Sequence, residues 1–518
     1  MGEVARASLP LTRSADFNPS PERLRELTSA MPTARRTAYD NYNVQTTVLA
    51  RSNASTVIIS DAPERHSDRT VPPAEGRRIA EMQDAYLRER DVLVIDGYIG
   101  NDVDFRVPAR LVMERSFANI AGMQAHLLFD GPGIGPEFEP DMTVIYTPGL
   151  AAPGYPDDRC IAVDLERGVT RVCNSDYFGE SKKNLLRLWN RIVYDRGGLA
   201  MHAGCKAIPT DGGEQTILIV GLSGTGKTTT TFTRQNESRP VQDDFIALMP
   251  GGKVYGSENG CFAKTYALDP DDEPTIHRAV TSRVSYLENV SQAEVDGPCD
   301  FFDQRHTQNG RAVFPMDALG WSRDARDLGP VHSLLILNRN DGLIPTVARL
   351  SAEQAAAYFM LGETRGTAAG GAAEAGRALR VPGTNPFFPL LHSQQGNRFK
   401  ELHDSGGFTA YLLNTGRVGG GDDDPRGKKV RIQDSSAVVR AIAEGTVSWE
   451  RDPDFGYDVA ARVPGIDDPE LLQPRLLYQR TGRQDAYREL VARLTRERLQ
   501  FLRSFPGLDP AIIAAVDR

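Results

Sequence analysis

The residues best suited to chemistry lie in one glycine-rich run, from Gly221 to Thr229. The run fits the phosphate-binding pattern G-x-x-x-x-G-K-[ST], with Gly221, Gly226, Lys227 and Thr228 at the fixed places. Glycines allow backbone N–H groups to point into one concavity, and the lysine ammonium can reach the β- and γ-phosphates of a nucleotide. The alternative is a plain glycine turn, which requires all of these residues to coincide by chance. The run therefore predicts a site for a nucleoside triphosphate.

The segments on either side of the run supply the elements that such a loop needs. Thr216–Val220 is short, apolar and β-branched, which predicts a buried strand, and the threonine-rich residues 228–233 can open a helix. A strand, a glycine loop and a helix N-terminus together cradle phosphates. The positions expected to contact the nucleotide here are Gly221, Leu222, Ser223, Gly224, Thr225, Gly226, Lys227, Thr228 and Thr229.

Three further polar clusters flank the glycine run and suggest a metal site. They contain Lys183, His202 and Asp244, the last in an Asp-Asp pair soon after the run. A lysine amine ligates a metal only when its pKa is driven down, and histidine favours softer divalent ions such as Mn²⁺ over Mg²⁺. The plain alternatives are a solvated lysine, a core histidine and an aspartate turn. The position of all three clusters around the glycine run favours metal binding.

Composition limits the class of protein. A chain of 518 residues is long enough for two or three domains, and its 40% hydrophobic content is ordinary for a globular protein. The net charge of −9 argues against general binding to nucleic acid or to anionic membranes. The five cysteines are scattered, and we find neither a signal peptide nor a run of about 18 apolar residues. These features predict a cytoplasmic protein without a nucleic-acid or membrane partner.

Strand and helix patterns alternate along the chain, which predicts an α/β fold with mixed α+β sheets. Expected strands cover residues 46–50, 55–59, 91–96, 142–147, 245–248, 331–337 and 409–414. Expected helices cover residues 21–27, 74–89, 110–128, 184–196, 350–359 and most of the chain after 483, with a turn at 97–100. The Gly- and Ala-rich residues 362–383 show no apolar periodicity and predict a loop or lid.

Several stretches in order resemble the ATP-dependent phosphoenolpyruvate carboxykinases. The family's glycine loop, Gly-Leu-Ser-Gly-Thr-Gly-Lys-Thr-Thr, is matched residue for residue. The matching stretches are Tyr177–Lys183, Met201-His202, Gly221–Thr229, Asp243-Asp244, Gly260–Thr265, Leu287–Val290, Arg311 with Phe314-Pro315, Leu412–Gly416 and Gly427–Ile432. The resemblance extends from about Val92 to near the C-terminus, and a series of motifs is far more specific than a glycine loop alone.

The resemblance implies a site with ATP, Mg²⁺ and Mn²⁺. By family pattern Lys183, His202 and Asp244 would hold Mn²⁺, Thr228 would hold the Mg²⁺ carried by the nucleotide, and Lys227 would neutralise the β- and γ-phosphates. The activity implied is conversion of oxaloacetate and ATP to phosphoenolpyruvate, ADP and CO₂, a step of gluconeogenesis. Two cations around one small dianion suit this chemistry, because an enolate must be stabilised before it attacks the γ-phosphoryl.

The remaining implied roles concern the organic acid, the adenine and the lid. Arg311 would stabilise charge on the γ-phosphoryl and the enolate, Tyr177 would lie against the carboxylate or the CO₂, and Ser223 would steer the phosphate. The adenine would be bordered by Lys429, Val430 and Ser435, and residues 362–386 would form the lid. The implied fold has two domains, a substrate domain at 1–198 and a nucleotide-binding domain with the phosphate loop at 199–518.

The match is poorest on the side of the organic acid. The family carries a Gly-Arg-Ser-Pro-Lys-Asp-Lys segment whose arginine binds the substrate carboxylate. We expect Ala62–Thr70 to correspond to it, with Arg65 as the candidate and Arg69 as the second choice. Phe245 follows the Asp-Asp pair where the family tends to have an acidic residue.

These departures leave alternatives to the carboxykinase. One is a kinase on the same fold that acts on another small acid or hydroxyl, and another is a nucleotide-binding regulator without catalysis. The retained metal set argues against the regulator, because an ATP sensor has no use for a second metal. The sequence is compatible with a monomer or a small homo-oligomer, and it does not fully decide between ATP and GTP.

Overall fold

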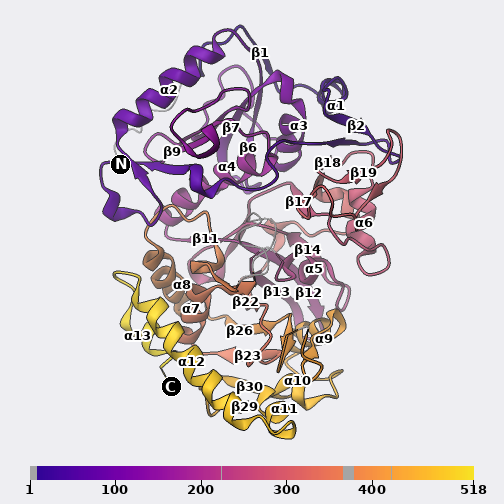
Figure 1. The fold of residues 1–518 in the computed structure, drawn as a ribbon, viewed down its shortest axis with the longest axis vertical. Helices are drawn as coiled ribbons and strands as arrows, with labels where there is room; N and C mark the ends of the chain where they lie inside the picture. The colour runs from indigo at the N-terminus through magenta and orange to yellow at the C-terminus, as the bar shows by residue number, and fades with distance from the viewer. Residues whose placement is uncertain (1–8, 223, 366–377, 422, 518) are drawn as a thin grey trace.

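The chain is described by a computed structural model that covers residues 9–222, 224–365, 378–421 and 423–517. In Figure 1 the indigo and purple N-terminal elements gather at the top and the orange and yellow C-terminal elements at the bottom, with the magenta elements between them. Within these described residues, no helix is long and apolar enough to cross a membrane. The mixed sheets confirm the predicted α/β class.

The upper half is built on an eight-stranded mixed sheet. In spatial order its strands are β1 (Ser14–Phe17), β6 (Asp91–Ile99), β7 (Val107–Glu114), β8 (Met142–Thr147), β10 (Val169–Cys173), β9 (Cys160–Asp164), β4 (Thr56–Ile59) and β5 (Thr70–Val71). Four helices accompany it: α1 (Pro21–Ser29), α2 (Pro73–Leu87), α3 (Ala118–Leu127) and α4 (Phe178–Asp195). The apolar stripe of α4, including Leu185, Leu186 and Trp189, is buried against this sheet's core, as its spacing predicts.

The lower half contains a second eight-stranded sheet, which carries the phosphate loop. Its order is β14 (Arg239–Gln242), β12 (Ala203–Thr210), β13 (Gly213–Val220), β22 (Val331–Asn338), β26 (Thr409–Asn414), β23 (Val347–Leu350), β30 (Asp458–Arg462) and β29 (Ser448–Arg451). Strand β13 lies between β12 and the parallel strand β22. The glycine run starts where β13 ends, at the carboxyl edge of the parallel strands, which is the usual place for a ligand.

Smaller sheets join the two halves. A three-stranded sheet holds β11 (Leu199–Met201), β15 (Ile246–Leu248) and β16 (Val254–Gly256). A five-stranded sheet has the order β17 (Gly260–Lys264), β21 (Arg311–Pro315), β18 (Tyr286–Glu288), β3 (Tyr42–Val44) and β2 (Ala34–Arg36). Because β3 pairs with β18, an N-terminal segment is hydrogen-bonded to elements far beyond residue 198. The division into two domains at that residue stays a prediction.

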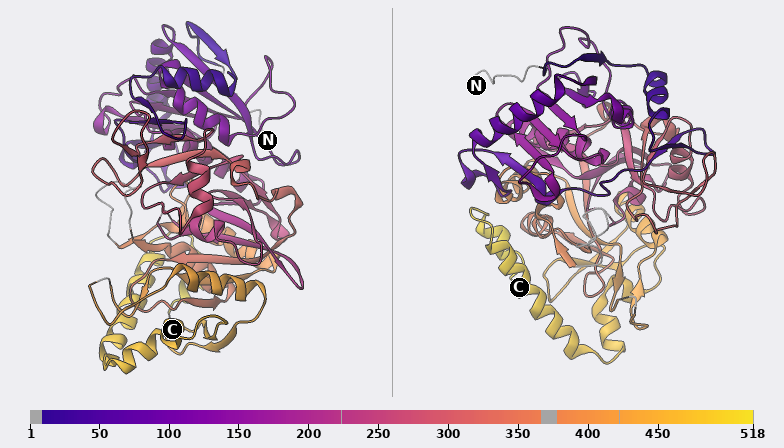
Figure 2. Two further views of the ribbon diagram at one scale, coloured as in Figure 1. Left: turned by 90° about the vertical axis from the view of Figure 1, so that its right-hand side faces the viewer. Right: turned by 45° about the horizontal axis from the view of Figure 1, so that its top comes forward.

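Further helices and two-stranded ribbons complete the fold, most of them in the lower half, whereas β19 (Ser291–Gln292) lies beside the upper half (Figure 1). The helices are α5 (Lys227–Phe232), α6 (Pro274–Val280), α7 (Ala352–Leu361), α8 (His392–Gly406), α9 (Ile432–Ala443), α10 (Pro469–Leu472), α11 (Pro474–Arg480), α12 (Gln484–Arg503) and α13 (Pro510–Ala514). The ribbons pair β19 with β20 (Cys299–Asp300), β24 (Glu363–Arg365) with β25 (Ala378–Arg380), and β27 (Arg417–Val418) with β28 (Lys428–Lys429). Figure 2 shows the long yellow helix α12 along the outside of the lower half. Its residues Leu499 and Leu502 join the core.

Three local predictions are wrong, each for a non-local reason. Residues 107–114 form β7 rather than the start of a helix at 110, because they pair along their whole length with β6. Residues 97–99 continue β6 instead of turning; Gly97 is needed there because a Cβ would lie 2.7 Å from Leu128. Residues 46–50 form no strand, and side chains from other segments bind this backbone instead.

The predicted lid lies only partly within the described residues. Residues 366–377 fall outside them. On either side, β24 and β25 pair in antiparallel fashion, and Gly362 ends α7 with a φ of 46°. The two ends of the predicted lid are thus anchored next to one another on the body of the protein.

Candidate active site

The phosphate loop opens onto a cavity of about 220 Å³ between the two halves of the molecule. Gly224 and Gly226 both have φ of 85°, a left-handed conformation that glycine adopts without strain. Helix α5 begins at Lys227 directly after the loop. Lys227, Thr228 and Thr229 line the cavity together with Leu222. The loop, strand and helix thus have the predicted arrangement, while Ser223 lies outside the described residues.

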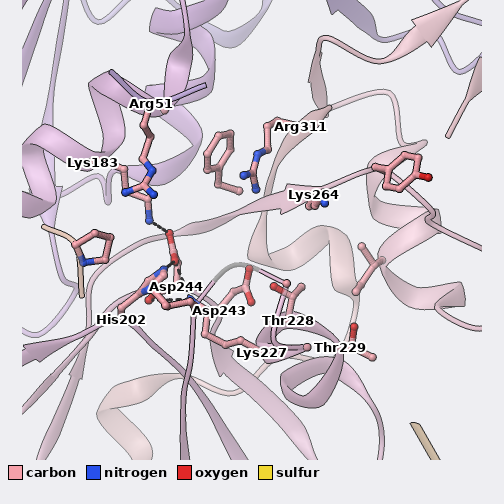
Figure 3. A pocket seen from close by; sticks show the side chains of 18 of the residues that line it. Arg51, Lys183, His202, Lys227, Thr228, Thr229, Asp243, Asp244, Lys264 and Arg311 are labelled. Atoms are coloured by element: carbon pink, nitrogen blue, oxygen red, sulfur yellow. Dashed lines mark hydrogen bonds and ion pairs between the residues drawn. The ribbon is translucent and has the colours of Figure 1, made fainter. Parts of the chain in front are cut away.

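Asp244 is the centre of the cavity wall (Figure 3). Its Oδ1 atom lies 2.8 Å from His202 Nε2 and 2.8 Å from Lys227 Nζ. Its Oδ2 atom accepts from Lys183 Nζ and lies 3.0 Å from Lys182 Nζ. The three residues predicted to hold one metal are therefore in direct contact, together with the lysine of the phosphate loop.

Three elements bring these side chains together. Lys182 and Lys183 lie in the first turns of α4, His202 follows β11, and Asp244 precedes β15. Because β11 and β15 pair with one another, His202 and Asp244 lie at the same end of one small sheet. The other nitrogen of His202, Nδ1, lies 3.0 Å from the Thr384 carbonyl, which fixes the ring so that Nε2 faces Asp244.

The electrostatics of this cluster suit metal ligation. Burial alone would raise the pKa of Asp244, but Lys182, Lys183 and Lys227 hold it well below its usual range. Burial lowers the pKa of Lys183 to about 7 and that of His202 to about 3. Both nitrogens can therefore be neutral near pH 7, which is the form that binds a cation.

Two aromatic rings, those of Phe245 and Phe387, lie beside the cluster. Phe245 occupies the position where the family tends to have an acidic residue. Lys183 Nζ lies 4.9 Å from the ring centre of Phe245 and 5.0 Å from that of Phe387. The rings of His202 and Phe245 are 5.2 Å apart. Phe245, the residue that departs from the family pattern, thus forms an apolar wall that contributes to the burial of Lys183.

A second acidic group faces the phosphate loop. Asp243 is buried, its Oδ1 atom has no hydrogen-bond partner within the described part of the chain, and it lines the cavity with Thr228. Burial raises the pKa of this carboxyl. A buried oxygen without a partner is costly unless a cation or water satisfies it. The Asp243 carboxylate and the Thr228 hydroxyl therefore fit Mg²⁺, a cation that prefers oxygen ligands.

Cations and a tyrosine line the part of the cavity away from the phosphate loop. Figure 3 shows Arg51 beside Lys183, with Arg311 and Lys264 across the cavity from them. Arg311 Nη2 donates to Asn309 Oδ1 at 2.8 Å, and Asn309 Nδ2 donates to the hydroxyl of Tyr177 at 3.2 Å. Arg311 and Tyr177 thus line the same part of the cavity, and their roles toward a small anion stay predictions.

Side chains from distant segments hold the loop that carries Arg51. The Asp176 carboxylate accepts from the backbone of Thr47 at 2.7 Å and of Val48 at 2.9 Å. Glu180 Oε1 accepts from the backbone N–H of Ser52 at 2.7 Å. Asn309 Nδ2 also donates to the Leu49 carbonyl at 2.7 Å. These bonds replace the strand expected at 46–50 and keep Arg51 facing the cavity.

Arg65 does not lie in the cavity. It is exposed in a short 3-10 turn, Pro63–Arg65, and is absent from the cavity lining. Residues just after this turn contact the C-terminal half instead: His66 Nδ1 lies 2.8 Å from the Pro389 carbonyl. Arg69 lies against Tyr155, away from the cavity. Arg51, rather than Arg65, lines the cavity.

Sequence reasoning overlooked Arg51 and Lys264 as site residues, and it named Asp243 only as a member of the Asp-Asp pair, without a role of its own. Arg51-Ser52 repeats the Arg-Ser of the family segment Gly-Arg-Ser-Pro-Lys-Asp-Lys, with Ala50 in place of its glycine, and this was the available signal. Lys264 stands in a matched stretch, Gly260–Thr265, which had been assigned no role. Burial and the nearby Arg311 lower the pKa of Lys264 to about 8.

A second cavity adjoins the phosphate loop. It shares Gly224, Gly226 and Thr229 with the first and is also lined by Lys429, Val430 and Ser435. The structure therefore brings the three residues predicted to border adenine next to the phosphate loop. This cavity also contains Gln235 and Ser436.

The metal set is unusual in composition. No group of three or more His, Cys, Asp or Glu side chains that could hold a metal occurs in the described parts of the chain. The cluster around Asp244 would instead offer a lysine as the third donor beside a histidine and a carboxylate. Its neutral nitrogens and its carboxylate still fit a divalent cation.

Comparison with known proteins gives one consistent result. The family model for phosphoenolpyruvate carboxykinase, PEPCK_ATP, matches residues 13–469. "Phosphoenolpyruvate carboxykinase (ATP)" of Mesorhizobium japonicum is 30% identical over 463 residues, which cover 87% of this chain and 84% of that protein. "Phosphoenolpyruvate carboxykinase (ATP) 1" of Moorella thermoacetica is 30% identical over 470 residues, 86% of each chain. The similarly named protein of Salinibacter ruber is 31% identical over 429 residues, 79% of this chain and 77% of that one.

Proposed function

This chain belongs to the phosphoenolpyruvate carboxykinase family, and we propose that it converts oxaloacetate and ATP into phosphoenolpyruvate, ADP and CO₂. The observation that carries the proposal is a single cavity in which a phosphate loop meets a Lys-His-Asp cluster and a set of cations suited to a small dicarboxylate. Neither a plain ATPase nor a nucleotide sensor needs the last two features.

The nucleotide would lie across the two adjoining cavities. Lys227 and the loop amides would neutralise the β- and γ-phosphates, which directs the γ-phosphoryl toward Asp244 and the cations beyond it. The adenine would lie in the second cavity, between Val430 and Ser435. In this proposal the transferred phosphoryl group would lie where the phosphate loop meets the part of the cavity that binds the acid.

Two cations complete the site in this proposal. Lys183, His202 and Asp244 would hold Mn²⁺, and Thr228 with Asp243 would hold Mg²⁺. When bound, such cations stabilise the negative oxygen of an enolate and of the transferred phosphoryl group. The depressed pKa of Lys183 supports this assignment, because an ammonium could not serve as a ligand.

The residues of the chain bind and shield the acid. Arg51 would pair with a carboxylate of oxaloacetate, Arg311 would stabilise charge that develops on the enolate and the γ-phosphoryl, and Tyr177 would lie against the carboxylate that leaves as CO₂. The ring of Phe387 lines the cavity, with Phe245 packed behind it, and would keep water from the enolate, which water would otherwise protonate.

The test is phosphoenolpyruvate formation from oxaloacetate and ATP, with Mg²⁺ and Mn²⁺ supplied together and GTP as the nucleotide control. We expect turnover with ATP, little with GTP, and loss of turnover in Lys183→Gln with ATP binding retained. Tight ATP binding without phosphoenolpyruvate formation by the wild-type protein would overturn the proposal and point to another acceptor.

A further inference from the structure

A lysine lies fully buried behind the phosphate loop, outside the machinery described above. Lys206, on β12, is 0% exposed, and it is paired with no carboxylate in the described residues. Its Nζ donates to the carbonyls of Thr230 at 3.0 Å and Thr233 at 2.5 Å, and to Gln235 Oε1 at 2.5 Å. The first two acceptors end α5, so this ammonium caps the helix that follows the phosphate loop.

The third contact sets the direction of a chain of hydrogen bonds. An ammonium donates three hydrogen bonds and accepts none, so the oxygen of the Gln235 amide must face Lys206. The amide nitrogen then faces α9, where it donates to Ser436 Oγ at 3.0 Å. Burial lowers the pKa of Lys206 to about 7, so the donor-only form is the one present below that pH.

The chain of bonds ends in the second cavity. Gln235 is only 4% exposed, whereas Ser436 is partly exposed, and both line the space next to Val430 and Ser435. Having accepted a bond from Gln235, the Ser436 hydroxyl has its own proton to donate, and no acceptor for it occurs among the described residues. Adenine offers ring nitrogens as acceptors.

We propose that Lys206, Gln235 and Ser436 form a directed hydrogen-bond relay that presents the Ser436 hydroxyl as a donor to the base of the nucleotide. Lys206 and Gln235 are positioning residues, and Ser436 makes the contact. The relay deepens the proposed function and rests on its use of ATP. It links the end of the helix that holds the phosphates to the wall that holds the base.

Gln235→Glu separates the relay from a merely structural role. The carboxylate still accepts from Lys206, so the cap of α5 is kept and the thermal midpoint should stay level or rise. It has no proton to donate, so Ser436 would turn its hydroxyl toward the carboxylate and away from the cavity. We expect the Kd for Mg²⁺-ADP to rise about tenfold, which corresponds to one lost hydrogen bond.

The measurement is calorimetric titration of the full chain with Mg²⁺-ADP at pH 6.5. Ser436→Ala should show the same loss, and the double variant should show no further loss, because both changes remove one contact. Gln484→Glu, an exposed glutamine at the start of α12, is the matched control and should bind as the wild type does.

Unchanged affinity in Gln235→Glu or in Ser436→Ala would overturn the relay, as would additive losses in the double variant. Failure of the wild-type protein to bind Mg²⁺-ADP at all would be a different result. It would contradict the proposed function itself, and with it the ligand that the relay is assigned.

Discussion

The two parts of the active-site cavity are built in opposite ways. The phosphate-binding part comes from one continuous stretch, a strand, a loop and a helix between residues 213 and 232. The part that we propose binds the acid, called the acid part below, takes Arg51, Tyr177 and Arg311 from segments more than a hundred residues apart. The first part is a local motif, whereas the second exists only because separate segments meet.

This difference explains where the chain departs from its family pattern. In the phosphate loop each glycine has a backbone role, so few substitutions preserve the geometry. In the acid part, the loop around Arg51 is held by Asp176, Glu180 and Asn309 from outside. Its own residues are therefore freer to change while the arginine keeps its place.

Asp244→Asn should have the largest effect, because Asp244 joins both parts. The variant leaves three lysines and a histidine around a neutral amide. Removing one partner of a buried ion pair costs about 3–5 kcal/mol, so the thermal midpoint should fall. We expect kcat/KM to fall about a thousandfold or more.

The check for Asp244→Asn is steady-state kinetics together with Mn²⁺ titration. Asp485→Asn on the exposed start of α12 is the control. Retention of both activity and Mn²⁺ affinity would mean that the two parts of the cavity do not share this carboxylate.

Arg51→Gln should affect the acid part of the cavity and leave the phosphate-binding part unchanged. A charged hydrogen bond to a carboxylate is worth about 1.5–3 kcal/mol, so KM for oxaloacetate should rise about 10- to 100-fold, while KM for ATP stays the same. Arg65→Gln is the matched control, because Arg65 is exposed outside the cavity. A larger effect from Arg65→Gln than from Arg51→Gln would reverse the assignment of the carboxylate-binding residue.

Glu288→Gln should give the smallest effect, a change in how the stability of the folded protein depends on pH. Glu288 lies next to the acid part of the cavity. Glu288 pairs with Arg311 in the β-ladder and accepts from the Phe178 N–H at the start of α4. Burial raises its pKa to about 8 from an ordinary value of 4.5. Between these values the folded state binds more protons than the unfolded chain, so wild-type stability falls as pH rises from about 5 to 8.

Glutamine cannot titrate, so the variant should lose this slope while it keeps an oxygen to accept from Phe178. Thermal midpoints of both proteins at pH 5, 6.5 and 8 test this, with Glu489→Gln on exposed α12 as control. We expect the thermal midpoint of the variant to rise relative to that of the wild type by a few degrees as the pH increases to 8. Parallel curves would show that Glu288 is ionised in the folded protein throughout this range.

The sequence by itself determined the local features of this protein. The strand before the glycine run, the loop and the start of α5 follow from residue types within about twenty positions, because glycine freedom and β-branched packing act locally. The apolar stripe of α4 follows for the same reason. The family motifs also supplied Lys183, His202 and Asp244 as a set.

Only the tertiary structure decided which residues join these features. Residues 107–114 became a strand because β6 offered a partner, and residues 46–50 became a loop because distant side chains bind its backbone. Arg51 rather than Arg65 faces the cavity for that reason. Pairing and side-chain bonds between segments far apart leave no periodic trace in either segment, so such choices are made only when the chain folds.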